Sequence, residues 1–255
     1  MKIYHLLGWL IVFLLGVGWE LVARAELISA LFLPPLSAVL WTFWMLTLDG
    51  TLPAHMLESM RNMFIGYGLA VLVAVPLGVF MGYSRAVFNL FDPAIELIRP
   101  LPATAVVPLA ILFLGIGPAE KIFVVFFTCV RIIVVNAMYG ARSVDPVLLE
   151  TARSYGYSGF RLVRRIILPA AMPQIVTGMR ISVPIAIVVI VAAEMLASDK
   201  GLGFFTSLSQ RIYATPEMYS GVVLLCIIGY VLNWLLQMIE GRLLAYHHES
   251  KQFMR

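Results

Sequence analysis

Residues 62–84 read NMFIGYGLAVLVAVPLGVFMGYS, a run of 23 residues without a charged side chain. A helix needs about 20 predominantly apolar residues to cross a bilayer, so this run predicts a membrane-spanning helix. Similar windows with few or no charges recur along the chain, and together they predict six membrane helices. The other five windows are 3–19, 100–119, 122–141, 173–198 and 218–239.

The composition of the whole chain agrees with this pattern. Hydrophobic residues make up 61% of the 255 residues, charged residues make up 13%, and the mean hydropathy is +0.94. A soluble domain of this length lacks the polar surface to cover so much apolar material. The same figures exclude a disordered chain, and two cysteines exclude a disulfide scaffold. The sequence therefore predicts an all-α membrane protein, a bundle of about six transmembrane helices.

The positive charges indicate how the bundle is oriented. Window 3–19 has the position of a signal peptide, but its long apolar run without a small-residue cleavage site favours an uncleaved helix. Six helices place both termini on one side, and the segments on that side carry eleven Lys and Arg residues against five opposite. The termini are therefore predicted to be cytoplasmic. The net charge of +4 reflects this asymmetry, and no basic patch with stacking aromatics indicates nucleic-acid binding.

Two shorter features concern packing. Residues 36–45 contain Trp41 and Trp44, and tryptophan is enriched at membrane interfaces. This segment is either an interfacial helix on the outer face or a helix packed on the outer ends of the bundle. The pattern Gly78-Val-Phe-Met-Gly82 places small residues one helical turn apart, which predicts close approach of another helix.

The loop between the fourth and fifth windows is the most informative stretch, SVDPVLLETARSYGYSGFRLVRRIILP over residues 143–169. Asp145 followed by Pro146 predicts a helix start, with an N-cap acceptor and then a proline at the first helical position. Gly156 suits the left-handed residue that ends such a short helix. The loop is thus predicted to begin with a capped helix lying on the membrane surface.

A second short helix is expected to follow in the same loop. Ser158 can cap it, and it would run to Ile166, after which Pro169 and Pro173 are expected to stop or bend the chain. The alternative is a basic linker held at the anionic inner leaflet. The capping signals favour the folded platform.

At these residues the chain resembles ABC-importer permeases, whose EAA loop has the signature Glu-Ala-Ala, three residues, Gly, nine residues, Ile-x-Leu-Pro. The matching residues are Glu150, Ala152, Gly156, Ile166, Leu168 and Pro169, with Thr151 in place of an alanine. Further segments are similar to the sulfonate, taurine and nitrate branch of that family, from about residue 30 to the C-terminal region. They are Pro76-Leu-Gly78, Leu90-Phe-Asp92-Pro93, Arg99-Pro-Leu-Pro102, residues 108–117, Ala192-Ala-Glu194-Met and Gly201-Leu-Gly203-Phe.

The resemblance implies a single transmembrane permease domain over residues 1–255, with a core at about 56–245 and a cytoplasmic coupling loop at about 142–169. Two copies are expected to form a homodimer in the lipid of a bacterial inner membrane, with cytoplasmic ABC ATPase subunits below and a substrate-binding protein outside. The residues of the EAA match are expected to contact the ATPase. The substrate implied is a small organic anion, an alkyl sulfonate or taurine, with nitrate, bicarbonate or a vitamin precursor as alternatives.

The chain itself shows no motif for chemistry. It lacks the Gly-x-x-x-x-Gly-Lys-Ser/Thr loop that cradles phosphates, so ATP and Mg²⁺ are expected on the partner ATPase and no cofactor is expected here. No hydrolase motif or metal-ligand spacing occurs, and neither an enzyme nor a metal site is predicted. His247-His248 is expected to be a solvated pair, and Cys129 and Cys226 are expected to be packing residues.

Two ionisable residues fall inside predicted helices and are candidates for the substrate pathway. Arg131 lies in the middle of window 122–141, and Glu194 lies near the outer end of window 173–198. Such residues usually face the bundle interior or a water-filled cavity. Arg131 pairs with Glu194, contacts an anionic substrate, or bonds backbone carbonyls that prolines leave free. A stand-alone channel or ion-driven carrier would need more intramembrane carboxylates, and a scaffold without transport would not need a structured cytoplasmic loop.

Overall fold

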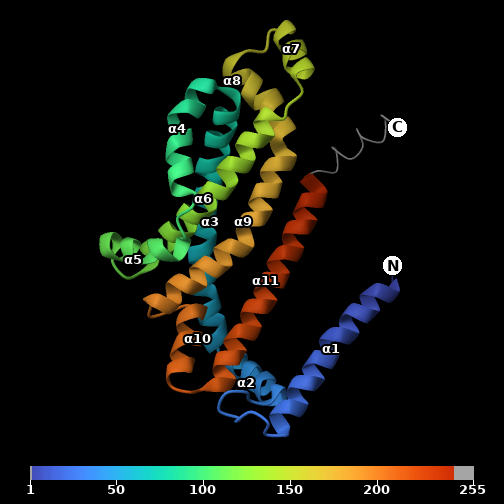
Figure 1. The fold of residues 1–255 in the computed structure, drawn as a ribbon, viewed down its shortest axis with the longest axis vertical. Helices are drawn as coiled ribbons and strands as arrows, with labels where there is room; N and C mark the ends of the chain where they lie inside the picture. The colour runs from blue at the N-terminus through green and yellow to red at the C-terminus, as the bar shows by residue number, and fades with distance from the viewer. Residues whose placement is uncertain (1, 244–255) are drawn as a thin grey trace.

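The computed structural model describes the backbone of residues 2–243 and the side chains of residues 10–11 and 13–238, and this part of the chain contains helices and no strands (Figure 1). His247 and His248, expected to be solvated, lie outside the described residues. In chain order the helices are α1 (Lys2–Arg24), α2 (Leu36–Leu48), α3 (Thr51–Tyr83), α4 (Arg85–Ile98), α5 (Ala103–Leu114), α6 (Pro118–Arg142), α7 (Pro146–Ser154), α8 (Gly159–Leu162), the π-helical turn η1 (Val163–Ile167), α9 (Leu168–Leu196), α10 (Leu202–Arg211) and α11 (Thr215–Leu243).

Four helical segments in the described part are long and apolar enough to cross a membrane: α3, α6, the rod of residues 159–196 that joins α8 to α9, and α11. They coincide with four of the predicted windows, and α1 covers a fifth, window 3–19. The membrane-helix prediction is thus confirmed for the bundle. The 38-residue rod is about 57 Å long at 1.5 Å per residue, so it extends well beyond a hydrocarbon core of about 30 Å.

Window 100–119 is organised differently from the prediction. Helix α5 has only 12 residues, and it is bent by 98° from α4 at the break between them. Pro100 and Pro102 lie at this break, where their missing N–H groups prevent a continuous helix. The single helix expected over window 100–119 is therefore replaced by two shorter helices, α4 and α5, that meet at a sharp bend.

Of the stop or bend expected at Pro169 and Pro173, the stop is wrong. The chain runs without a break from α8 through η1 into α9, with Pro169 near the start of α9 and Pro173 inside it. The π-helical turn lies directly before Pro169. Such a turn re-spaces the backbone hydrogen bonds where a proline removes a donor, so the rod continues through the proline.

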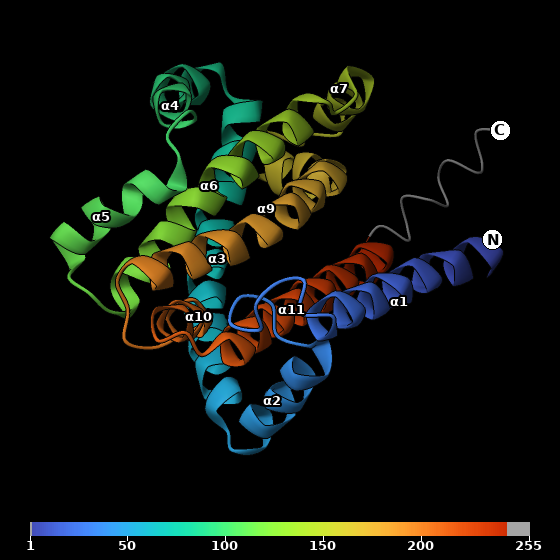
Figure 2. The same cartoon turned by 60° about the horizontal axis from the view of Figure 1, so that its bottom comes forward.

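Helices α3, α6 and α9 form the core of the molecule (Figure 2). A Cβ atom added at Gly78 would lie 2.4 Å from the Val134 carbonyl oxygen, and one added at Gly82 would lie 2.5 Å from the Ala141 Cβ, both on α6. The prediction that this glycine pair admits a close helix is confirmed. Tight backbone contact of this kind provides the dispersion attraction that holds helices together in lipid.

The two ends of the bundle carry different elements (Figure 1). Helix α7 lies at one end, together with the end of α6, and α2 and α10 lie at the other. The α2 helix combines both expected arrangements: Val39 is buried and its carbonyl accepts a bond from Ser220 of α11, whereas Trp41 and Trp44 are more than half exposed. The loop of residues 143–169 and the α2–α10 end are thus on opposite sides of the bundle.

Candidate functional site

The platform helix α7 begins as its sequence predicts. The Asp145 carboxylate accepts a hydrogen bond from the Val147 backbone N–H at 2.8 Å, and Pro146 occupies the first helical position. The carboxylate satisfies one of the donors that a helix start leaves free, and its negative charge also suits the positive end of the helix dipole. The start of α7 is therefore fixed by local interactions alone.

The end of α7 is equally well defined. Gly156 has φ +82, and its N–H donates to the Arg153 carbonyl at 2.9 Å, while the Tyr157 N–H donates to the Ala152 carbonyl at 3.0 Å. These are the two bonds of a Schellman C-cap, which needs a residue in the left-handed region. The predicted role of Gly156 is confirmed. Ser158 stands at the N-cap position of α8, but its hydroxyl makes no capping bond.

Helix α7 is packed onto the membrane helices by a small apolar cluster. Ala152 is buried, and it belongs to a cluster that also contains residues of α3, α6, α8, η1 and α9. Its other buried members are Val79, Ala137, Ala141, Val144, Leu162, Val163, Ile167, Ala171 and Ile175. Ala152 is the buried residue of α7, and through it α7 rests on a cluster that three long helices share.

The remaining residues of the predicted coupling set lie on the same platform. Glu150 and Thr151 are exposed on α7, with the Thr151 hydroxyl bonded to the Val147 carbonyl at 2.8 Å. Ile166, Leu168 and Pro169 are half-buried where η1 passes into α9. Glu150 and Thr151 thus face outward from α7, whereas the other three residues lie where the 159–196 rod passes into α9.

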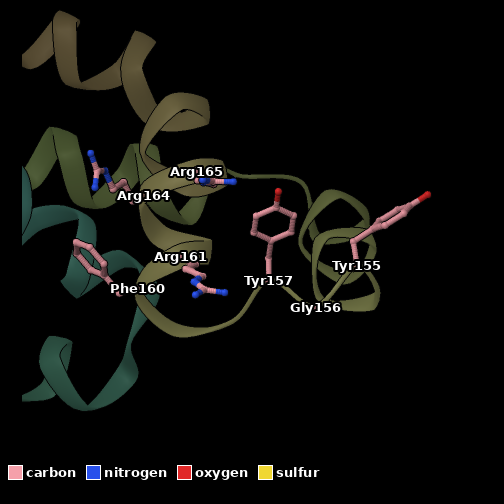
Figure 3. A pocket seen from close by; sticks show the side chains of 7 residues that line it. All are labelled: Tyr155, Gly156, Tyr157, Phe160, Arg161, Arg164 and Arg165. Atoms are coloured by element: carbon pink, nitrogen blue, oxygen red, sulfur yellow. The ribbon is translucent and has the colours of Figure 1, made fainter.

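An open, basic pocket lies between α7 and α8 (Figure 3). It has a volume of about 780 Å³ and is lined by Tyr155, Gly156, Tyr157, Phe160, Arg161, Arg164 and Arg165. The Phe160 ring stacks on Phe80 of α3 with centroids 6.5 Å apart, which ties one wall of the pocket to the bundle. Three guanidinium groups around one solvent-filled pocket make this end of the molecule suited to an acidic surface.

Arg131 does not pair with Glu194 of the same chain. Its Nη1 donates to the carbonyls of Ile98 at 2.9 Å, Arg99 at 3.2 Å and Leu101 at 2.7 Å, and the guanidinium lies 5.0 Å from the Phe127 ring centroid. These carbonyls belong to the break between α4 and α5. Of the three arrangements considered from the sequence, this contact set is the bonding of free carbonyls.

Glu194 is held in a fully buried network at the other end of the bundle. Its carboxylate accepts the Ser59 hydroxyl at 2.8 Å and the Gly203 N–H at 2.9 Å. The Ser59 oxygen in turn accepts the Leu202 N–H at 2.8 Å. A Cβ atom at Gly201 would lie 2.2 Å from the Glu194 carboxyl carbon. We call Ser59, Glu194 and residues 201–203 the outer clamp, because they tie α3, α9 and α10 together.

The sequence did not single out several residues of this region. Ser59 is an unremarkable polar residue in its helix, and only the fold brings it to Glu194. Lys121 is buried and donates to the Ser198 hydroxyl at 2.6 Å. Glu120 is buried with neither carboxylate oxygen hydrogen-bonded within the described part of the chain. The sequence feature that could have pointed to these two residues is that they form a charged pair directly before the apolar window 122–141.

Comparison with known proteins identifies the family. The family described as "binding-protein-dependent transport system inner membrane component" matches residues 74–244. The chain belongs to the family of binding-protein-dependent transport system inner membrane components. The chain is therefore a multi-pass membrane permease of the ABC-importer class.

Relatives of this permease are named as subunits of transport systems for particular small anions or sulfonates. The taurine transport system permease protein TauC of Escherichia coli K12 is 35% identical, over 92% of this chain and 87% of its own length. The putative aliphatic sulfonates transport permease protein SsuC of Bacillus subtilis 168 is 28% identical, over 90% and 83%. The nitrate import permease protein NrtB of a Synechocystis strain is 30% identical, over 76% and 70%. The expected sulfonate, taurine and nitrate branch is confirmed.

Solved structures support the fold of the permease. A chain of the MetNI methionine ABC transporter in an inward-facing conformation superposes with a TM-score of 0.64 at 20% identity, covering 73% of this chain and 93% of that one. At this identity the likeness concerns the fold. The all-α bundle predicted from the sequence is therefore confirmed as the permease architecture.

Proposed function

We propose that this permease is the membrane subunit of an ATP-driven importer for a small sulfonate, either taurine or an alkyl sulfonate. The names of the TauC and SsuC relatives support this substrate class. The relative named for nitrate import makes nitrate the second candidate. Two permease copies form the pathway as a homodimer, a binding protein delivers the substrate outside, and two ATPase subunits bind ATP and Mg²⁺ inside.

The observation that carries the proposal is the construction of α7. It is capped at both ends, at Asp145 and Gly156, and Ala152 packs it onto the cluster shared by α3, α6 and α9. A capped helix that rests on a cluster shared by three long helices can pass a movement of a partner to the bundle. We therefore assign the ATPase contact to Glu150 and Thr151, with Ile166, Leu168 and Pro169 supporting the platform from the start of α9.

The orientation follows from the same assignment. The basic pocket of Arg161, Arg164 and Arg165 lies at the α7 end, which is the end that the positive-inside rule makes cytoplasmic. Three exposed guanidinium groups complement the acidic surface of a cytoplasmic partner or the anionic inner leaflet. The α2 and α10 end then faces the binding protein. This places α7 within reach of the ATPase and both termini in the cytoplasm.

The test uses two substitutions at Gly156. Because φ is +82 and a Cβ there meets nothing within 4 Å, the effect of a side chain is backbone strain alone. Asn tolerates the left-handed region and Val does not. We expect Gly156→Asn to retain uptake and Gly156→Val to lose most substrate-stimulated ATP hydrolysis, while both variants still insert in the membrane. Equal activity of the two variants would contradict the coupling role of α7.

A second experiment separates the proposed importer from a stand-alone carrier. The purified permease should bring an ATPase subunit with it, and uptake into proteoliposomes should require ATP together with the binding protein. Uptake driven by an ion gradient without any ATPase would refute the proposal.

A further inference from the structure

Helix α5 lies at membrane depth without crossing the membrane. It has 12 residues and is about 18 Å long at 1.5 Å per residue, too short for a hydrocarbon core of about 30 Å. Its buried residues Val107 and Ala110 pack in one cluster with Val124 of α6 and Ala193 of α9. These partners belong to spanning helices, so α5 lies at their depth, where it stands out to one side of the core helices (Figures 1 and 2).

The break that precedes α5 is at membrane depth and uncovered in a single chain. Residues 99–102 are all exposed, and Arg131 from the middle of α6 donates to carbonyls on both sides of Pro100. Directly before the break, Glu96 and Arg99 form an ion pair in which both side chains are about half exposed. Irregular backbone and ionisable side chains at this depth face protein or water, because lipid tails cannot satisfy them. This side of the bundle therefore faces away from lipid.

The outward side of α5 is apolar and hollowed. A groove of about 450 Å³ lies between α5, the break and the first turns of α6, and its nine lining residues are all apolar, among them Leu109, Phe113 and Phe127. An apolar hollow is a poor place for water, since water needs polar partners. Of the two surroundings that the break allows, the groove is therefore suited to protein.

The shape of α5 indicates which protein fits. Leu112 does not line the groove but projects beside it from the same helix, with 76% of its surface exposed. A projecting residue next to a hollow is what a two-fold contact between identical chains requires, because the same patch then meets itself. Close apolar packing of this kind also holds helices together in lipid, where no hydrophobic driving force acts between them.

We propose that a second copy of this chain covers the groove, with α5 of each copy packed on α5 of the other about a two-fold axis. Leu112 of each copy is seated in the groove of the other. This contact places the α4–α5 break against protein and leaves the Glu96–Arg99 pair beside the space between the two copies, where water reaches it. The inference rests on the proposed homodimer and names the helix that forms its interface.

The first test is cysteine cross-linking in membranes that contain the permease together with its ATPase. The background is Cys226→Ser, which removes the exposed cysteine and keeps the buried Cys129. Oxidation with copper phenanthroline should convert most Leu112→Cys chains into a covalent dimer. Leu72→Cys is the matched control, since Leu72 is 71% exposed in the spanning helix α3 and should remain monomeric after the same treatment.

The second test fills the groove. Leu109→Trp places a large ring where Leu112 of the other copy is expected, and Leu72→Trp makes the same change on α3. Dimer dissociation is measured by diluting the purified full-length permease in detergent micelles without the ATPase, so that permease contacts alone hold the dimer. We expect Leu109→Trp to raise the dissociation constant about tenfold or more through overpacking, and Leu72→Trp to leave it unchanged.

The outcomes separate this interface from the homodimer itself. Cross-linking of Leu112→Cys no stronger than that of Leu72→Cys, or a dissociation constant that Leu109→Trp does not raise, would overturn the α5 interface. An unchanged thermal unfolding curve verifies that each tryptophan variant is folded. The mass of the solubilised permease–ATPase complex gives the number of permease copies: two copies would leave the proposed homodimer intact, whereas one copy would refute it as well.

Discussion

The outer clamp gives the sharpest stability prediction, and Ser59→Ala is the perturbation. The Ser59 hydroxyl has two partners from distant parts of the chain: it accepts the Leu202 N–H and donates to the Glu194 carboxylate, both at 2.8 Å. All three residues are buried, so water cannot replace the missing oxygen. The substitution therefore leaves an amide without an acceptor and takes one donor from a buried carboxylate.

The magnitude follows from these two losses. An orphaned buried donor costs about 1–3 kcal/mol, and a hydrogen bond to a charged group contributes about 1.5–3 kcal/mol. Because the two terms share one network and do not add fully, we expect the free energy of unfolding to fall by about 3 kcal/mol. Glu194→Gln should cost less, because Ser59 and Gly203 both donate to the same carboxylate oxygen, Oε2, which the amide oxygen of glutamine can replace.

The assay is reversible unfolding in mixed detergent micelles, with Ser182→Ala as the control. Ser182 is also fully buried; its hydroxyl donates to the Met179 carbonyl of its own helix at 2.8 Å and also bonds the Tyr67 hydroxyl, which keeps its own bond to that carbonyl at 2.9 Å. Its loss leaves no donor orphaned, so we expect a change below about 1 kcal/mol. If Ser59→Ala is no more destabilising than Ser182→Ala, the clamp is not the connection described here.

Three further predictions follow from the same geometry. Gly201→Ala should strongly lower the free energy of unfolding, because φ is +108 at this position and the new Cβ would lie 2.2 Å from the Glu194 carboxyl carbon. The control in the same unfolding assay is Gly68→Ala, whose Cβ would meet nothing within 4 Å. Because Gly68 lies in the middle of a helix, this substitution should be neutral or stabilising. The effects of Arg131→Gln and Glu194→Gln on unfolding should add within about 0.5 kcal/mol, since the two residues share no partner, and rescue of one by the other would instead reveal an ion pair. A cysteine at exposed Gln210 should react with an impermeant thiol reagent in intact cells and one at exposed Ser143 should not; the reverse pattern would invert the proposed orientation.

The local features of this protein could be predicted from the sequence because they depend on neighbours in the chain. Helix α7 begins at Asp145-Pro146 and ends at Gly156 because caps and turn residues act over a few positions. Long uncharged runs mark the spanning helices since the bilayer sets their length. The coupling loop could be recognised from the sequence because all residues of its motif lie within one short segment, residues 150–169.

The sequence misjudged the prolines, because their effect depends on what surrounds them. Pro169 and Pro173 are accommodated in a continuous rod that contains a π-helical turn, whereas Pro100 and Pro102 accompany a 98° bend. At the bend, the carbonyls of Ile98 and Leu101 are satisfied by Arg131 from another helix. A residue 30 or more positions away thus decides whether a break is tolerated, which no local pattern reveals.

The sequence by itself determined the membrane class, the family and the cytoplasmic platform, since composition, apolar length and local capping carry that information. Only the tertiary structure decided the partners of the ionisable residues. Glu194 binds Ser59, which lies 135 positions earlier in the chain, and Arg131 binds the carbonyls of Ile98 and Leu101 at the break between α4 and α5. Buried polar groups must find partners wherever the fold brings them, so their pairing depends on how the helices pack, which only the folded chain determines.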